Sequence, residues 1–262
     1  MIKEETCTSI IEQLQLHGRN LQINLKTHCI EVEKSLIPSP TLYIAYKTGN
    51  VNVLSYHPGQ IVIKKEKKNT TVSPFNHEHV KLYHEYLSKI WTPPTVTFNV
   101  FMPCTQKKPY RTSVTHRMML HYIRMLQGKG LKTMMYSISE PMLLVPYTLE
   151  LFYPLSNYEF PPKLMTEREK EIMKKLLAKL LPKFLKKAQY NVFVLPKHHA
   201  QIVLDALAKG STVTEAKTEM GVSVHKLQNN AILFEYGRLA FKTISTAYRT
   251  MLKLTERLPK EF

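Results

Sequence analysis

The sequence predicts an α/β fold, a three-layer sandwich in which helices cover both faces of a sheet. From about residue 75, helical and strand patterns alternate along the chain, which is the order typical of an α/β layer fold. A chain of 262 residues, 44% hydrophobic and 22% charged, is also long and apolar enough to bury a full core. These observations exclude a disordered chain, a collagen and a coiled coil.

Residues 1–75 predict a small β-rich unit. An amphipathic helix is expected over residues 3–16. Short β-rich runs, separated by Pro, Gly and Asn, follow at 21–25, 29–33, 42–46, 51–55 and 60–63. Runs of this length between turn residues are typical of antiparallel strands.

Residues 76–197 predict the α/β layers themselves. The expected strands cover 96–102, 132–138 and 190–195. The expected helices cover 78–90, the residues that follow Ser113, and 166–187.

Residues 198–262 predict a helical C-terminal module with a break near Gly221. The segment 212–230 resembles a helix-turn-helix, whose second helix would begin at Val224. That helix would present to base edges the residues Gln228, Asn229 and Asn230. A plain helical cap on the α/β layers is the alternative.

The charge of the chain predicts a polyanionic partner. Lys and Arg number 37 against 20 Asp and Glu, which gives a formal net charge of +17, and a surface this basic attracts nucleic acid. No apolar stretch approaches the roughly 20 residues of a membrane span, and the N-terminus, Met1 to Glu5, lacks an apolar signal core. We therefore expect a cytoplasmic protein that does not enter a membrane.

Cofactor and metal motifs are missing from the sequence. The three cysteines stand far apart without a CxxC pair, and no glycine falls in the GxGxxG or GxxxxGK spacing of nucleotide sites. The spacing of His77, His79 and His84 does not converge on one helical face, and we interpret His198 and His199 as a helix start. We expect no metal and no cofactor.

The loop 103–116 holds the residues best suited to chemistry, because it follows a predicted strand and precedes a predicted helix. Ligands of open α/β sheets bind at such strand ends. Neighbouring cations, Lys108 among them, can lower the pKa of the Cys104 thiol and make it a nucleophile. Alternatively, Cys104 is structural, Ser113 caps the helix, and His116 lies in its first turn.

The arrangement PC-x3-KPY-x2-S-x2-H in this loop resembles the signature of the archaeosine synthase family of archaeal tRNA-modifying enzymes. Its fixed positions here are Pro103, Cys104, Lys108, Pro109, Tyr110, Ser113 and His116. A second ordered pattern follows in Glu140, Val145-Pro146, Glu150, Tyr153-Pro154 and the segment from Tyr158 to Pro161. The resemblance covers roughly residues 95–200.

The resemblance implies a uracil-DNA-glycosylase-like α/β fold and an enzyme that acts on tRNA. It implies that an amine, taken to be lysine, adds across the nitrile of 7-cyano-7-deazaguanine at position 15 of tRNA. A radical-SAM partner would then release the finished base. Full-length members carry a C-terminal β-rich PUA domain, and the helical pattern of residues 198–262 predicts a short form without it.

A nitrile carbon needs a nucleophile, and the reaction needs a group that moves a proton. We expect Cys104 to add to the nitrile and His116 to move the proton. Lys108 or Ser113 would stabilise the charge that develops on nitrogen. The residues expected to bind the substrate are Pro103, Tyr110, Arg111, Glu140, Glu150 and Tyr153.

The predicted helix 166–187 carries lysines on the outer face of an amphipathic pattern, and a basic loop lies at 64–69. Such residues neutralise nucleic-acid phosphates and release counterions. The expected phosphate-binding residues are Lys64, Lys65, Lys67, Lys68, Arg168, Lys174, Lys175, Lys179 and Lys183. A solvated face is the plain alternative.

Two functions remain open at this point. The first is a tRNA-modifying transferase of archaeosine formation, with tRNA as its partner. The second is a non-catalytic protein on the same scaffold that binds duplex DNA through the helix-turn-helix-like tail.

Overall fold

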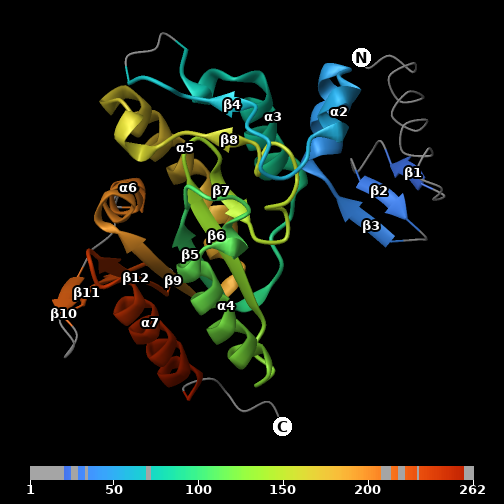
Figure 1. The fold of residues 1–262 in the computed structure, drawn as a ribbon. Helices are drawn as coiled ribbons and strands as arrows, with labels where there is room; N and C mark the ends of the chain where they lie inside the picture. Colours follow the sequence, from blue (N-terminus) through green and yellow to red (C-terminus); the bar gives the residue numbers. More distant parts are fainter. Residues whose placement is uncertain are drawn as a thin grey trace. The chain divides into compact units, whose positions relative to one another are not determined.

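The structure, a computed structural model, describes residues 21–24, 29–32, 35–68, 72–207, 214–217, 222–228 and 230–256. The chain divides into two compact units. Figure 1 labels their helices and strands. Unit 1 comprises residues 1–92, 140–142 and 148–169, and unit 2 comprises residues 93–139, 143–147 and 170–262. These bounds differ from the boundaries expected near residues 75 and 197. In the part of the chain described, no helix is both long and apolar enough to cross a bilayer.

Unit 1 contains a three-stranded antiparallel sheet and several short elements. The sheet consists of β1 (Leu21–Asn24), β2 (Cys29–Val32) and β3 (Ser35–Pro38), paired in that order. The helices are α2 (Pro40–Thr48) and α3 (Glu78–Glu85), and a π-helical turn, Tyr86–Ile90, follows α3. Strand β4 (Ile63–Lys64) pairs in parallel with β8 (Tyr158–Glu159). The strands expected at 21–25 and 29–33 are confirmed, whereas the helix expected over 3–16 lies outside the described residues.

Two of the runs predicted as strands are helical, and this prediction is wrong. Residues 42–46 lie within α2, and residues 51–55 form a 3-10 helix. The Oγ of Ser39 accepts a hydrogen bond from the N–H of Leu42 at 3.3 Å, Pro40 opens the helix, and Gly49 ends it with φ of 70°. A Ser-Pro start and a left-handed Gly stop are strong helix boundaries, and here they outweigh the β-rich composition between them.

A buried ion pair in unit 1 holds the start of α5 (Glu167–Leu185). The Nζ of Lys65 donates to both carboxylate oxygens of Glu169, at 2.6 and 2.7 Å, and the Oγ of Ser73 donates to the same carboxylate at 2.6 Å. Glu169 also accepts from the N–H of Thr166 at 2.7 Å, while the Oγ1 of Thr166 accepts from the N–H of Glu169 at 3.3 Å. This reciprocal pair is a capping box. Burial raises the pKa of Glu169, but these hydrogen bonds outweigh burial and lower it.

Unit 2 is built on a seven-stranded mixed sheet in the order β10-β11-β12-β9-β5-β6-β7. The strands are β5 (Val96–Pro103), β6 (Thr133–Ser139), β7 (Leu143–Pro146), β9 (Ala188–Pro196), β10 (Thr214–Lys217), β11 (Ser223–Leu227) and β12 (Ala231–Tyr236). Strands β12, β9, β5 and β6 run parallel, and the strands outside them pair antiparallel. Strands β5, β6 and β9 confirm those expected at 96–102, 132–138 and 190–195.

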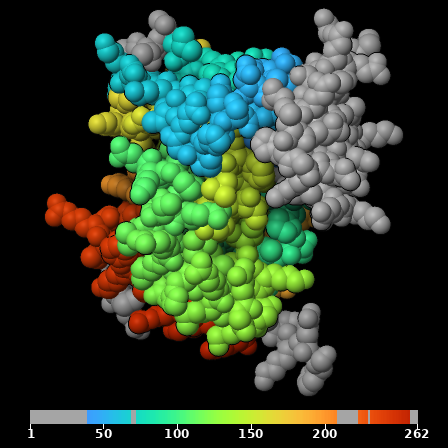
Figure 2. All heavy atoms as spheres, turned by 45° about the vertical axis from the view of Figure 1, so that its right-hand side comes forward, coloured from blue at the N-terminus to red at the C-terminus, as the bar shows by residue number. Residues whose placement is uncertain are grey.

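Helices cover both faces of this sheet. On one face, α4 (Val114–Gln127) and α7 (Ala240–Thr255) share a core with β5 and β9, and the stacked rings of Tyr122 and Tyr248, 4.3 Å apart, join the two helices. On the other face, Phe184 of α5 packs edge-on against Tyr136, and α6 (Lys197–Leu207) packs on β9 and β12. Residues on the outer side of α4 are exposed, and Figure 2 shows this green segment at the surface. The three predicted helices of the middle segment are confirmed as α3, α4 and α5.

The C-terminal segment is not the helical module that the sequence predicts. Strands β11 and β12 occupy the place of the expected second helix of a helix-turn-helix, and Asn230, with φ of 50°, lies with Gln228 in the turn between them. Strand β12 pairs in parallel with β9, so it belongs to the sheet. A short apolar run such as residues 231–234 does not differ in periodicity from a buried helix segment, and only long-range pairing reveals it as a strand.

A pair of buried asparagines ties α5 to the centre of the sheet. Asn99 of β5 lies opposite Asn191 of β9, and its Nδ2 donates to the Oδ1 of Asn191 at 3.1 Å. Asn99 also donates to the carbonyl of Phe184, and Asn191 donates to the carbonyl of Leu185, each at 3.0 Å. Because the last carbonyls of a helix lack partners within the helix, these amides satisfy the end of α5.

We predict that Asn191→Leu lowers the free energy of unfolding by about 2–5 kcal/mol. The substitution leaves the Leu185 carbonyl and one Asn99 N–H buried without these hydrogen bonds. Each buried polar group that loses its hydrogen bond costs about 1–3 kcal/mol. Urea unfolding followed by circular dichroism measures the change. Gln189→Leu, an exposed site on the same strand, is the matched control. Equal stability of the two variants would contradict the role of the asparagine pair.

Candidate functional site

The carboxyl ends of the four parallel strands of unit 2 lie at one edge of the sheet, because parallel neighbours point the same way. At this edge Tyr236 ends β12, and His199 lies in the first turn of α6, directly after β9. Cys104 follows β5. Glu140, which follows β6 in the sequence, belongs to unit 1. Sheets of this class bind their ligands at such an edge.

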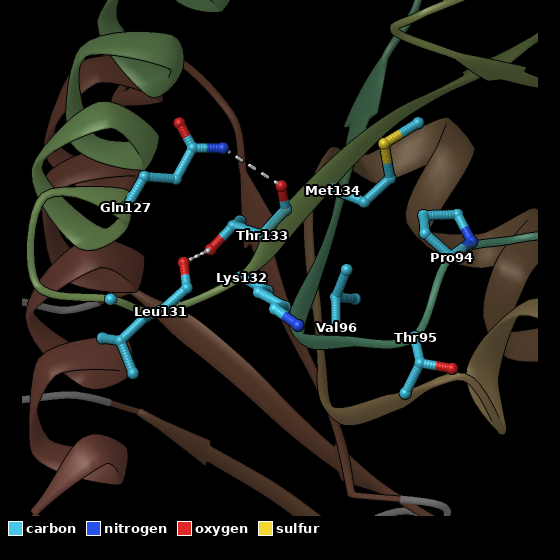
Figure 3. Close-up of a pocket in the computed structure, with 9 residues that line it drawn as sticks. Pro94, Thr95, Val96, Gln127, Leu131, Lys132, Thr133 and Met134 are labelled. Atoms are coloured by element: carbon cyan, nitrogen blue, oxygen red, sulfur yellow. Dashed lines mark hydrogen bonds between the residues drawn. The ribbon is translucent and has the colours of Figure 1, made fainter. Parts of the chain in front are cut away.

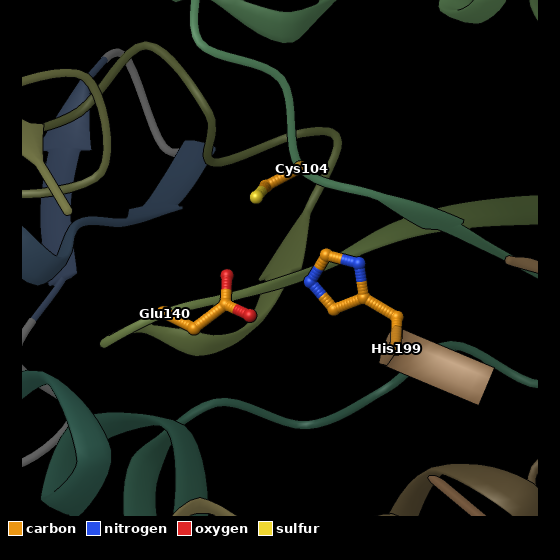
Figure 4. Close-up of side chains that lie close together, drawn as sticks. All are labelled: Cys104, Glu140 and His199. Atoms are coloured by element: carbon orange, nitrogen blue, oxygen red, sulfur yellow. The ribbon is translucent and has the colours of Figure 1, made fainter. Parts of the chain in front are cut away.

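Cys104 lies at the centre of this edge. Its N–H donates to the carbonyl of Ile138 at 2.8 Å, which extends the pairing of β5 with β6 by one residue and fixes the backbone of Cys104. Its Sγ and a ring nitrogen of His199 lie within 4.8 Å of each other. Figure 4 shows these two side chains. The thiol is partly exposed and the imidazole is buried.

Tyr236 shares this environment with the thiol. The pKa of its phenol rises to about 12, first because the ring is largely buried and second because negative charge on Cys104 disfavours a second anion. The phenol therefore keeps its proton at neutral pH and acts there as a hydrogen-bond donor.

His116 lies beneath the loop and holds its first residue. The Nε2–H donates to the carbonyl of Pro103 at 2.9 Å, and the imidazole is fully buried. Burial lowers the pKa of His116 to about 4, against the opposing effect of the bond to Pro103, so the ring is neutral at pH 7. His116 is therefore held in the interior by its bond to Pro103, and the proton transfer expected from the sequence stays a prediction.

The other signature residues pack around His116. The Oγ of Ser113 accepts from the N–H of His116 at 3.3 Å and so caps α4. The Tyr110 ring is buried 5.6 Å from the His116 ring, and its hydroxyl donates to Ser139 at 3.2 Å, so Tyr110 is core and does not stack on a base. The Nζ of Lys108 lies 6.0 Å from the centre of that ring. Arg111 lies 4.7 Å from the ring centre of Tyr147.

Three residues expected to bind the substrate, Glu140, Glu150 and Tyr153, belong to unit 1 and are buried. The hydroxyl of Tyr153 is hydrogen-bonded to the Nδ1 of His79 at 2.5 Å, and burial raises its pKa. The structure thus brings Pro103, Tyr110 and Arg111 together with Cys104 in unit 2. Glu140, Glu150 and Tyr153 belong to the other unit.

The predicted phosphate-binding residues fall into two groups. Those with exposed side chains are Lys64, Lys67, Lys68, Arg168, Lys175 and Lys179. Lys174 pairs with Glu171 at 2.8 Å and with Asp205 at 2.7 Å, and burial together with Lys186 lowers the pKa of half-buried Lys183. Lys65 is buried on Glu169 and cannot reach a phosphate, so the prediction is wrong for Lys65.

A hollow of about 540 Å³ opens at the opposite edge of the sheet (Figure 3). It is lined by residues 94–96 at the start of β5 and by Gln127 and residues 130–134 between α4 and β6. This hollow lies at the amino ends of the strands and holds none of the predicted site residues. The signature loop with Cys104 lies at the other edge, at the carboxyl ends of the strands.

Sequence reasoning missed His199 and Tyr236. A signal was present for His199, because it follows a predicted strand just as Cys104 does. The sequence carries no such signal for Tyr236, because the apolar run before it fits a buried helix as well as a strand.

Comparisons with known proteins give one family match and several more distant relatives. A family model described as a domain of unknown function, DUF5591, matches residues 80–231, more than half of the chain. The archaeosine synthase of Methanocaldococcus jannaschii is 28% identical over 193 residues, which cover 70% of this chain and 31% of that protein. The archaeosine synthase subunit alpha of Thermoplasma acidophilum is 27% identical over 113 residues, 43% of this chain and 21% of that protein.

A third relative, the archaeosine synthase of Haloferax volcanii, is 31% identical over 91 residues, 35% of this chain and 14% of that protein. The matched part of the chain therefore spans less than a third of each of these relatives. Among solved structures, that of AF0587, a protein of unknown function, gives a TM-score of 0.41 at 17% identity and covers 69% of this chain and 51% of that one.

We predict that His116 makes the protein less stable in acid. Between its usual pKa of 6.5 and about 4, the unfolded chain binds a proton at this site that the folded chain does not, so stability falls as the pH drops through that range. His116→Gln keeps a donor for Pro103 but does not titrate, so it should lose less stability between pH 7 and pH 5 than the wild type. Thermal melts at the two pH values measure this. His121→Gln, exposed on the same helix, is the control and should behave as the wild type.

Proposed function

Since the chain belongs to the DUF5591 family and its curated relatives are archaeosine synthases, we propose that it is a tRNA-modifying enzyme of archaeosine formation. The observation that carries the proposal is the position of Cys104, a partly exposed thiol at the carboxyl edge of the parallel strands, within the signature loop. The net charge of +17 supports a nucleic-acid substrate.

The proposed reaction joins an amine, taken to be lysine, to the nitrile of 7-cyano-7-deazaguanine at position 15 of tRNA. The Sγ of Cys104 bonds to the nitrile carbon, one π bond of the nitrile breaks, and its electrons pass to the nitrogen, which takes up a proton. The amine nitrogen then bonds to the same carbon and loses a proton, and the C–S bond breaks, so that the thiolate of Cys104 leaves with the electrons of that bond. The product is an amidine, and nothing is oxidised or reduced.

The other residues of the loop support this step. Lys108 or Ser113 stabilises the charge that develops on the nitrogen, and His116 holds the Pro103 carbonyl beside the nucleophile. The proposal extends to a uracil-DNA-glycosylase-like sandwich, a cytoplasmic location, and a radical-SAM partner that releases the finished base. The alternative of duplex-DNA reading has lost its support, because strands occupy the expected recognition helix.

We predict that Cys104→Ala lowers formation of the adduct by at least about 100-fold, since covalent catalysis is lost, while the fold and tRNA affinity persist. The measurement is mass spectrometry of tRNA nucleosides from a deletion strain that carries the wild type, Cys104→Ala, or the control Gln106→Ala, an exposed residue of the same loop. Normal archaeosine in the deletion strain itself would refute the proposed function. More than half of wild-type product with Cys104→Ala would refute only the role of the thiol.

Phosphate contact is proposed for exposed lysines of α5. Replacing Lys175 and Lys179 together with Gln should lower the slope of log affinity for tRNA against log salt by about one unit per lost contact. Lys174→Gln is the matched control, because its charge is already neutralised by Glu171 and Asp205 and its loss should leave the slope unchanged. Titrations at four or more salt concentrations give the slopes. An unchanged slope in the double variant would mean that Lys175 and Lys179 are only solvated and do not contact phosphates.

A further inference from the structure

We propose that His199 is the general base that takes the proton of the Cys104 thiol. The inference rests on the proposed function only for the identity of the electrophile, the nitrile. Pairing of the thiol with the imidazole is a property of the protein alone and can be measured without tRNA.

The fold brings the two side chains together from distant parts of the sequence. Cys104 follows β5 and His199 follows β9, and these two strands are adjacent, parallel and paired along their length. The Sγ of Cys104 and a ring nitrogen of His199 lie within 4.8 Å (Figure 4). Catalytic contacts of this kind are often longer in the absence of substrate and tighten in its presence.

The surroundings suit a base that is fixed in place. His199 is 1% exposed, lies in the first turn of α6, and packs against the exposed His198 ring at 4.1 Å. Cys104 remains partly open to solvent, so a substrate can reach the sulfur while the imidazole stays shielded. Two titratable groups of unit 2 interact with this pair: the His198 ring packs against His199, and Tyr236, which is neutral at pH 7, lies near Cys104.

His116 is a poorer base for the same thiol. Its Nε2–H is committed to the Pro103 carbonyl, and the ring lies buried under the loop. We therefore give the two histidines different roles: His116 positions the loop, and His199 moves the proton.

The proton cycle balances with these groups alone. A ring nitrogen of His199 takes the proton from Sγ, which leaves a thiolate and an imidazolium. When the thiolate bonds to the nitrile carbon, the nitrile nitrogen receives the π electrons and takes that proton back from His199. The imidazole is then neutral again and able to accept the proton that the attacking amine must lose before the thiolate departs.

Alkylation of Cys104 by iodoacetamide, followed by peptide mass spectrometry that resolves the Cys104 peptide, tests the pairing. At pH 7 an isolated thiol is only a few per cent thiolate, so His199→Gln should slow alkylation about tenfold or more. At pH 10 the rates of the variant and the wild type should converge, because both thiols are then ionised. His198→Gln, the exposed neighbour, is the matched control and should alkylate as the wild type does.

Several outcomes would overturn the proposal. One is equal alkylation of His199→Gln and wild type at pH 7, and another is a rate deficit that persists at pH 10, which would indicate altered access to the sulfur. A stoichiometric zinc ion in the purified protein, whose removal is needed before Cys104 reacts, would make the pair a metal site instead. If His199→Gln does not fold, the wild type alone decides, because a midpoint of its alkylation profile at or above the ordinary thiol value of about 8.5 excludes the pairing.

Discussion

The amide pair between Asn99 and Asn191 is the interaction on which the arrangement of unit 2 depends. It fixes the register of β5 against β9 at the centre of the sheet, and it supplies donors to the last carbonyls of α5. A slip of one residue in that register would turn side chains to the opposite face and separate the two strand ends. The distance between Cys104 and His199, at the ends of these strands, is therefore set by a polar contact in the interior. A polar pair in a core has little tolerance for other pairings, because any other register leaves buried amides unsatisfied.

The central strands and long helices could be predicted from sequence because their patterns are local. β5, β6 and β9 are apolar runs between turn residues, and α4 opens at a Ser cap. The incorrect predictions concern segments in which helix-capping residues or long-range strand pairing outweigh amino-acid composition. Residues 42–46 are rich in β-forming side chains, but Ser39 and Gly49 fix a helix around them. Strand β12 is an apolar run whose conformation is decided by its pairing with β9, and no local signal carries that information.

The signature loop shows what sequence resemblance can and cannot provide. It located Cys104, and the N-cap role of Ser113 followed from its place before a helix. The resemblance does not show that the His116 side chain faces inward to the Pro103 carbonyl. Nor does it show that His199, almost a hundred positions after Cys104, lies near the thiol. The lysines show the same limit. Lys65 and Lys175 look alike in sequence, but Lys65 is buried on the carboxylate of Glu169, which is far away in the chain, and Lys175 is exposed.

The placement of chemical groups at the ends of separate parallel strands has a consequence for how such a protein diverges. Cys104 and His199 lie in the separate connections that follow β5 and β9, and Tyr236 is the last residue of β12. Each connection can therefore be replaced or lengthened alone, because the sheet beneath holds its position. Relatives with an unchanged scaffold can differ in reactivity through a single altered connection. Inheritance of the fold and inheritance of the chemistry are then separable, and membership of the family by itself does not specify the reaction.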